Sequence, residues 1–153
     1  MTHSWIEPLD GEDDLAGVME IDRLSFATPW SRQMYDAELG NPGVSFLAVL
    51  RTADCRVAGY CSYWIVLDEV LINNVAVRPE YRGRGLGRRL VEHILRSGAT
   101  LGLARALLEV RRGNEPARQL YEKLGFTRIG VRRDYYNAPV EDALVLERRL
   151  GPG

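Results

Sequence analysis

Short apolar segments rich in β-branched residues alternate along the chain with longer segments whose apolar residues recur every three or four positions. The first pattern predicts strands and the second predicts amphipathic helices. The strongest helical stripe comprises Leu86, Leu90, Ile94, Leu95 and Leu101. Strands are predicted at 4–9, 44–50, 57–67, 70–77, 104–110, 126–132 and 140–148, and helices at 10–24, 31–39, 86–101 and 114–124.

The connections between these segments indicate how the strands pair. Thr52-Ala53-Asp54 is a turn-forming sequence between two strand segments, which predicts an antiparallel hairpin. The strands at 70–77 and 104–110 flank the long helix, so we expect them to be parallel neighbours joined by a right-handed crossover. The order of elements predicts a mixed α/β layer structure in a single domain, residues 1–153.

Composition narrows the class of protein. The 153 residues are 46% hydrophobic with a formal net charge of −1. No apolar run approaches 18 residues and the first residues are acidic, so we expect a cytoplasmic protein with no membrane partner. The small net charge and the lack of an aromatic and basic platform count against nucleic acid as a partner. Cys55 and Cys61 have no second pair or histidine cluster near them, so we expect packing thiols and no metal.

A glycine-rich loop, Arg82-Gly83-Arg84-Gly85-Leu86-Gly87, lies between a predicted strand and the long helix. Glycines let backbone N–H groups converge on an anion, and a helix N-terminus adds partial positive charge. The spacing does not fit a P-loop. A dinucleotide-binding loop remains an alternative, because Glu109 follows Gly87 by 22 residues, about where such a loop has its ribose-binding acid. A basic turn that only begins a helix also fits. Arg82, Gly85 and Gly87 fully match a third pattern, Arg/Gln-x-x-Gly-x-Gly/Ala. The loop therefore resembles the acetyl-coenzyme A loop of the GNAT N-acetyltransferases.

Further segments extend this resemblance over roughly residues 5–148. They are similar to the RimI-type subgroup of GNAT enzymes, the bacterial ribosomal-protein-alanine N-acetyltransferases. These segments are Phe26, Pro29-Trp30-Ser31, Leu107-Leu108-Glu109-Val110-Arg111, Asn114, Leu120 to Phe126 and Arg132 to Tyr136. The resemblance implies a GNAT fold, which is a mixed, mostly antiparallel sheet with one parallel pair splayed around acetyl-CoA and helices on both faces.

The resemblance also implies the ligands and the residues that bind them. Acetyl-CoA would be the cosubstrate, and the acceptor would be a basic protein N-terminus, most specifically the N-terminal alanine of a small-subunit ribosomal protein. The residues that would bind the coenzyme are Val75, Ala76, Val77, Arg82, Gly83, Arg84, Gly85, Leu86, Gly87, Arg88 and Asn114. The residues that would border the acceptor are Phe26, Pro29, Trp30 and Tyr136. Asn114 also fits a helix N-cap, Trp30 and Tyr136 also fit a core, and the arginines also fit a solvated helix face.

Acetyl transfer to an α-amino group requires a base, because that group has a pKa of about 8 and is mostly protonated at pH 7. In the resembling family the glutamate that matches Glu109 is the base. Glu109 is also the carboxylate near the C-terminal end of a central strand, where open α/β sheets bind ligands. A structural ion pair with Arg111 or Arg112 is the alternative.

The leaving thiolate calls for an acid, and Tyr121 on the short helix is the candidate that the resemblance favours. The alternative is a half-buried core tyrosine with its hydroxyl at the rim. For the whole protein, three functions remain open: an N-terminal acetyltransferase, an acetyltransferase of small amines, and a non-catalytic nucleotide-binding or nucleic-acid-binding module. Residues 1–70 carry 12 acidic residues against 4 arginines. If these carboxylates surround the acceptor groove, they should attract a cationic acceptor; a scattered solvated surface is the alternative.

Overall fold

The computed structural model describes residues 3–151 and contains a seven-stranded sheet in the order β1-β2-β3-β4-β5-β7-β6. The strands are β1 (Ser4–Pro8), β2 (Ser45–Thr52), β3 (Cys55–Val66), β4 (Glu69–Val77), β5 (Arg105–Arg111), β6 (Thr127–Asn137) and β7 (Val140–Arg149). The helices are α1 (Gly11–Ser25), α2 (Arg32–Leu39), α3 (Leu86–Thr100) and α4 (Glu115–Lys123), with a 3-10 turn, η1, at Pro79–Tyr81. The predicted order of elements and the α/β class are confirmed.

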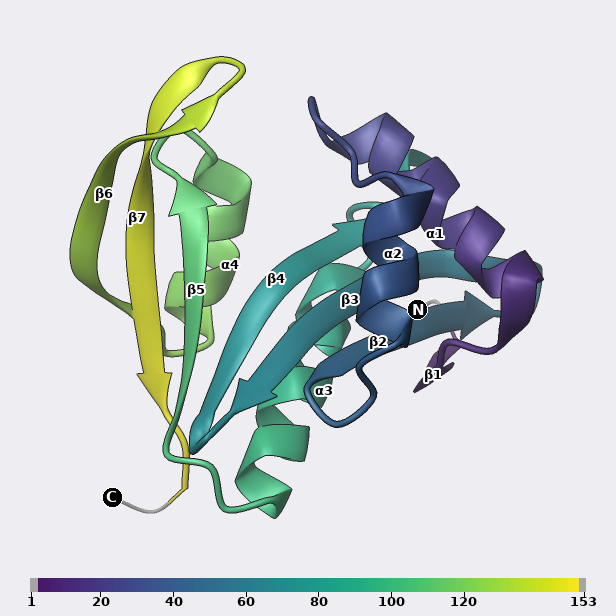
Figure 1. Ribbon diagram of the computed structural model, residues 1–153, viewed down its shortest axis with the longest axis horizontal. Helices are drawn as coiled ribbons and strands as arrows, with labels where there is room; N and C mark the ends of the chain where they lie inside the picture. The colour runs from purple at the N-terminus through teal and green to yellow at the C-terminus, as the bar shows by residue number, and fades with distance from the viewer. Residues whose placement is uncertain (1–2, 152–153) are drawn as a thin grey trace.

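One parallel pair divides the sheet. β4 and β5 are parallel neighbours, and every other neighbouring pair is antiparallel. Their register runs only from Glu69 opposite Arg105 to Ile72 opposite Leu108. Beyond that point β4 stays with β3 and β5 stays with β7, so the two strands spread apart, as Figure 1 shows. Beyond Ile72 and Leu108, β4 and β5 therefore have no backbone pairing with each other.

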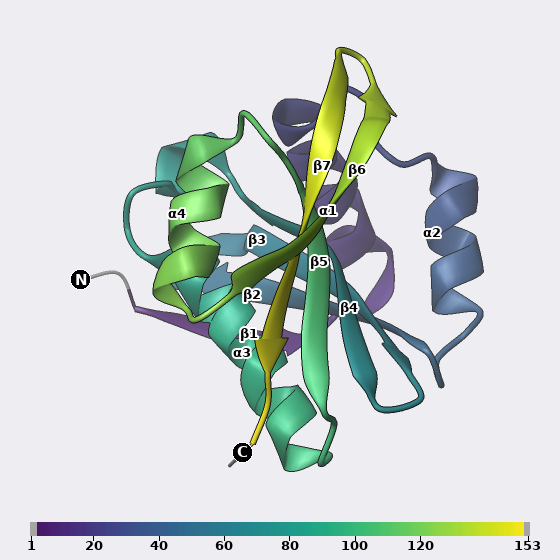
Figure 2. The ribbon, with the colours of Figure 1, turned by 90° about the vertical axis from the view of Figure 1, so that its left-hand side faces the viewer.

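Helices cover both faces of the sheet. Figure 2 shows α3 and α4 on one side and α2 on the other. Alternation along β3 divides the core between these faces, since Cys61 packs with the α3 residues and Tyr60 packs with the α1 residues. The long helix buries Leu86, Leu90 and Ile94 as its apolar stripe predicts.

The boundaries differ from the sequence expectation in a few places. Leu101 does not extend the buried stripe, because α3 ends at Thr100 and Gly102 takes a left-handed φ of 73°, which leaves Leu101 62% exposed. β6 continues to Asn137, five residues past the predicted end, with register shifts against β7 at 128–130 and 132–136.

Cys61 is buried and Cys55 partly buried, and both are free thiols.

Two features are absent from the residues that the structure describes. Within residues 3–151, no helix is long and apolar enough to cross a membrane. The same residues contain no group of three or more His, Cys, Asp or Glu side chains arranged to hold a metal ion.

Candidate active site

Three adjoining pockets follow the opening between β4 and β5. The loop pocket, of about 520 Å³, lies against the glycine loop and α4, and the central pocket, of about 350 Å³, lies between the splayed strands. The tryptophan pocket, of about 490 Å³, is bordered by Trp30 and Trp64. Tyr121 lines the first two pockets and Glu109 lines the last two. These shared residues show that the pockets adjoin one another, and the three together are called the passage.

The glycine loop forms the wall of the loop pocket. Gly83 and Gly85 have left-handed φ angles of 79° and 77°, although a Cβ at either would meet nothing within 4 Å. Backbone conformation, rather than lack of space, therefore requires these glycines. Gly85 is also the N-cap of α3 and offers no side chain to cap it, so the first N–H groups of the helix remain free to bind an anion.

The predicted coenzyme residues divide into two groups. Most of them line the loop pocket: Val75, Ala76, Val77, Arg82, Gly83, Gly85, Leu86, Gly87 and Asn114. Arg84 and Arg88 are not among its lining residues. Arg84 stacks over Tyr81 at 4.8 Å, and Arg88 lies 3.5 Å from Glu92 on its own helix. Both side chains nevertheless keep positive charge near the loop.

Arg82 and Asn114 each have a structural contact as well as a place in the pocket wall. Arg82 donates from Nε to the carbonyl of Val77 at 3.0 Å, which fixes the loop against the end of β4. Asn114 accepts from the backbone N–H of Ala117 at 3.3 Å and so caps α4. The capping role predicted for Asn114 is confirmed, and the same residue lines the loop and central pockets.

Glu109 projects from β5 into the passage because its neighbours Leu108 and Val110 face the core. Its Oε1 lies 3.5 Å from Nε of Arg132 on β6. Its Oε2 is buried and has no hydrogen-bond partner among residues 3–151. Buried carboxylate oxygens are normally satisfied, so this atom is available to a ligand. The alternative of a structural ion pair with Arg111 or Arg112 is wrong, since those arginines lie near Glu141 and Asp142 instead.

Tyr121 is in the wall between the loop and central pockets. It is 9% exposed and packs edge-on against Phe126, with ring centroids 5.5 Å apart. Burial, with smaller contributions from Tyr136 and Cys61, raises the pKa of Tyr121 to about 12. The phenol therefore keeps its proton at neutral pH. Tyr121 belongs to the core and also lines the passage. A packing role and the predicted role as proton donor are therefore compatible.

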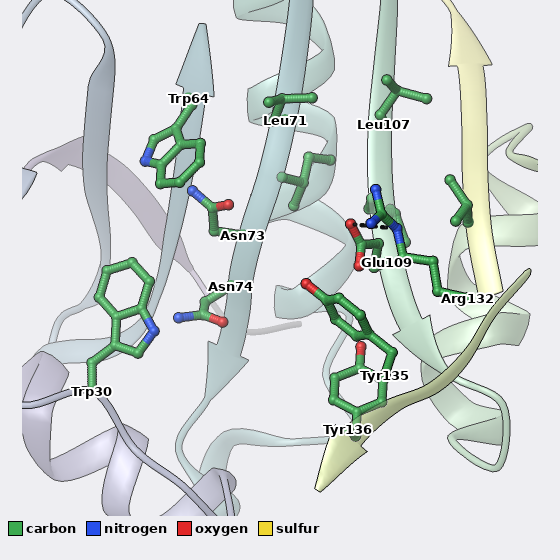
Figure 3. A pocket seen from close by; sticks show the side chains of 13 residues that line it. Trp30, Trp64, Leu71, Asn73, Asn74, Leu107, Glu109, Arg132, Tyr135 and Tyr136 are labelled. Carbon is green, nitrogen blue, oxygen red and sulfur yellow. Dashed lines mark ion pairs between the residues drawn. The ribbon is translucent and has the colours of Figure 1, made fainter. Parts of the chain in front are cut away.

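Aromatic side chains surround the tryptophan pocket, and Figure 3 shows Trp30 and Trp64 facing Tyr135 and Tyr136 across it. The indole of Trp64 donates to Glu38 at 2.9 Å. Tyr135 and Tyr136 pack edge-on, with centroids 5.1 Å apart. Burial, followed by the charge of Glu109, raises the pKa of Tyr136 to about 12.

The segment between α1 and α2 places Phe26 and Trp30 at the passage. A buried network supports it, because Tyr35 and Tyr60 both donate to the carboxylate of Asp22. Burial raises the pKa of Asp22 above its ordinary value. Phe26 lines the loop and central pockets, and Trp30 lines the central and tryptophan pockets.

Comparison with known proteins fits this geometry. The model of the Acetyltransferase (GNAT) family matches residues 15–126. The chain belongs to the GNAT family. The [Ribosomal protein bS18]-alanine N-acetyltransferase of Salmonella typhimurium is 39% identical over 135 residues, which are 87% of this chain and 89% of that protein.

Solved structures of GNAT relatives share the fold. The crystal structure of the ribosomal-protein-S18-alanine N-acetyltransferase from Escherichia coli aligns with a TM-score of 0.88 and 32% identity, covering 99% of this chain and 96% of that one. A chain in the crystal structure of the NatC complex bound to Gag peptide and CoA aligns with a TM-score of 0.84 and 25% identity, covering 97% and 99%.

In this GNAT chain some pocket residues were missed by the sequence analysis. Trp64, Asn73 and Asn74 line the tryptophan pocket beside the predicted Trp30, whereas Pro29 lines none of the pockets described above. Two adjacent asparagines inside an otherwise apolar strand are a recognisable signal, because asparagine is depleted in strands. Arg132, the ion-pair partner of Glu109, begins the segment Arg132 to Tyr136, whose resemblance to GNAT enzymes assigned it no role.

Proposed function

We propose that the protein transfers the acetyl group of acetyl-CoA to the N-terminal α-amino group of a protein. The acceptor in this proposal is the N-terminal alanine of a bacterial small-subunit ribosomal protein. The observation that carries it is the buried, unpartnered Oε2 of Glu109, a residue that lines both the central and the tryptophan pockets. The names of the Salmonella typhimurium and Escherichia coli relatives support the acceptor class.

The loop pocket has the groups that acetyl-CoA requires. The pyrophosphate would accept hydrogen bonds from the N–H groups of 83–87 at the start of α3, with Arg82, Arg84 and Arg88 supplying positive charge. The pantetheine amides would pair with the edge of Val75, Ala76 and Val77, which β5 leaves open once it separates from β4. Asn114 would contact the same arm.

The proposed reaction is a direct attack within a ternary complex. Glu109, directly or through a water molecule, removes a proton from the acceptor ammonium, and the neutral nitrogen attacks the thioester carbonyl. The new C–N bond forms and the C–S bond breaks. The nitrogen releases its second proton to solvent, and after turnover Glu109 returns its proton to solvent while Tyr121 regains one from solvent. Tyr121 donates a proton to the departing sulfur, since its phenol is protonated at neutral pH. Trp30, Tyr136, Phe26 and Pro29 would border the acceptor.

The first test concerns the coenzyme. Acetyl-CoA should raise the melting temperature of the protein, while ATP, NAD and a short oligonucleotide should not. A shift with ATP or NAD but none with acetyl-CoA would contradict the proposal and favour a nucleotide-binding module.

The second test concerns the acceptor. An alanine-starting peptide with a ribosomal-protein sequence should be acetylated with a higher kcat/KM than polyamines or aminoglycosides. The reverse order would support the alternative, an acetyltransferase of small amines. In cells, a deletion strain should lose the acetyl group from one ribosomal-protein N-terminus, which mass spectrometry of purified ribosomes can measure.

A further inference from the structure

A β-bulge in β4 directs an asparagine into the passage. Ser62 faces Asn74 and Tyr63 faces Ile72 in the ladder between β3 and β4, so Asn73 is the extra residue between them. A bulge re-aims side chains and commonly lies next to a functional site. Asn73 and Asn74 both line the central and tryptophan pockets as a result.

The side-chain amide of Asn73 lacks a partner. Its Nδ2 is buried, and no group in residues 3–151 accepts a hydrogen bond from it. Leaving a buried donor unsatisfied costs about 1–3 kcal/mol, so an apolar side chain of similar size would stabilise the free protein better. An asparagine at this position is therefore explained by a ligand that accepts the bond.

The position of Asn73 indicates which ligand atom it meets. Figure 3 shows Asn73 on β4 beside Trp64, while Glu109 projects from the neighbouring β5. Both residues line the same two pockets. When Glu109 receives the acceptor amine, the carbonyl oxygen of the first acceptor residue lies only about 3 Å from that nitrogen by covalent geometry. Every peptide acceptor has this carbonyl, whatever its side chains.

We propose that Asn73 is an acceptor-binding residue that donates from Nδ2 to the carbonyl of the first peptide bond of the acceptor. This inference rests on the proposed function. It adds a basis for selectivity: an amine without an adjacent carbonyl leaves Nδ2 unsatisfied and binds less well. Peptide N-termini are thereby preferred over simple amines.

Replacement of Asn73 tests the role by separating binding from stability. Asn73→Leu removes the donor at nearly constant size. It should raise the KM of an alanine-starting peptide roughly tenfold, leave kcat and coenzyme affinity within about twofold, and leave the melting temperature equal or higher. Asn73→Asp should raise KM further, because a carboxylate repels the carbonyl oxygen. Asn41→Asp, which makes the same change at an exposed asparagine outside the pockets, is the control and should leave KM unchanged.

A peptide with a thioamide in place of one amide tests which acceptor carbonyl Asn73 contacts. Sulfur is a weaker hydrogen-bond acceptor than oxygen, so a thioamide at the first peptide bond should raise KM for the wild-type protein but not for Asn73→Leu. A thioamide at the second bond should affect both proteins equally. Additive effects of Asn73→Leu and the first-bond thioamide would overturn the assignment, as would a wild-type KM that does not respond to that thioamide.

The outcomes also separate this inference from the proposed function. If the wild-type protein does not acetylate the normal peptide, the proposed function fails. If it does, and Asn73→Leu acts like wild type, only the role of Asn73 fails. The thioamide comparison on the wild-type protein keeps the test decisive even if Asn73→Leu does not fold.

Discussion

At the scale of single residues, unsatisfied polar atoms mark the site better than residue type does. Among the described residues, three buried side-chain atoms lack a hydrogen-bond partner: Ser62 Oγ, Asn73 Nδ2 and Glu109 Oε2. Two of the three belong to residues that line both the central and the tryptophan pockets. Folding leaves Asn73 Nδ2 and Glu109 Oε2 unpaired at a cost in free energy, and the proposed acceptor would pair them.

Glu109→Gln removes the proposed base with little change in shape. It should lower kcat by roughly 10² to 10⁴ at neutral pH while coenzyme affinity stays unchanged. Steady-state kinetics and calorimetric titration with the coenzyme measure the two effects. Glu122→Gln, at an exposed position on α4, is the matched control. Wild-type turnover of Glu109→Gln from pH 6 to 9 would refute the assignment of the base.

Tyr121→Phe removes one hydroxyl from the wall between the loop and central pockets. We expect kcat to fall roughly 10²-fold with a smaller change in KM, because the leaving sulfur loses its proton donor. Since burial raises the pKa of Tyr121 to about 12, its phenol does not titrate near neutrality. The ratio of wild-type to variant kcat should therefore be constant from pH 6 to 9. A ratio near one would leave Tyr121 with a packing role only.

At the scale of secondary-structure elements, a buried carboxylate attaches α1 to the hairpin of β2 and β3. Asp14 is 0% exposed and binds Arg51 at 2.7 Å and Arg56 at 2.9 Å. The hydrogen bond from Arg51 is the main reason why the pKa of Asp14 falls to about 2. This contact holds the helix that leads into Phe26 and Trp30.

Arg51→Met leaves the buried Asp14 carboxylate with only Arg56 and the backbone N–H of Asp10 as partners. The free energy of unfolding at pH 7 should fall by about 3 kcal/mol. A lowered folded-state pKa stabilises the fold above the ordinary pKa of the carboxyl, 3.8, and this contribution disappears as the pH falls toward about 2. The difference between wild type and variant should therefore shrink between pH 5 and pH 2 in urea unfolding experiments.

Arg32→Met is the control for that comparison. Arg32 forms exposed ion pairs with Glu12 and Asp36, so its loss should cost less than about 1 kcal/mol. Equal destabilisation by the two variants would mean that burial of Asp14 does not set the strength of its pairing.

The turn before α3 gives a second prediction for an element. Gly85→Ala should weaken coenzyme binding at least tenfold, because a side chain opposes the left-handed φ that aims the loop N–H groups. Gly102→Ala is the control, because Gly102 has a φ of 73° just past the far end of α3. The same backbone strain there, about 1–2 kcal/mol, should lower stability without changing coenzyme affinity. Equal coenzyme affinity in Gly85→Ala and Gly102→Ala, measured by calorimetry, would exclude the loop as the phosphate site.

At the scale of the whole molecule, charge is distributed unevenly. Residues 71–153 carry 9 acidic against 16 basic residues, the reverse of residues 1–70. Several acidic residues of the first half are paired, for example Glu12 with Arg32, Glu20 with Arg78 and Glu69 with Arg105. The remaining field should still favour a cationic acceptor, but modestly.

A peptide pair tests this attraction. An alanine-starting peptide with arginines at positions two to five should have a kcat/KM about threefold above that of a neutral version at low salt, and the advantage should disappear as ionic strength rises. Steady-state kinetics from 20 to 500 mM salt measure it. A preference that persists at high salt would indicate direct side-chain contacts instead of long-range attraction.

Local sequence alone determined the order and type of the elements and the position of the glycine loop. Apolar periodicity sets the strands and helices, and the glycine spacing sets the turn before α3, because both depend on neighbours within a few residues. The resemblance to GNAT enzymes, carried by motifs along the chain, added the candidate roles of Glu109 and Tyr121. Burial then showed that Tyr121 is part of the core as well as of the passage.

The tertiary structure decided which distant residues meet. The ion-pair partner of Glu109 is Arg132, across β7 on β6, rather than a neighbour on its own strand, because sheet order and not sequence distance sets that contact. The bulge that turns Asn73 inward depends on the register with β3, and Trp64 lines the tryptophan pocket only because β3 lies beside β4. Long-range pairing of strands is not encoded in local periodicity, so the wall of the passage opposite Glu109 became visible only in the folded chain.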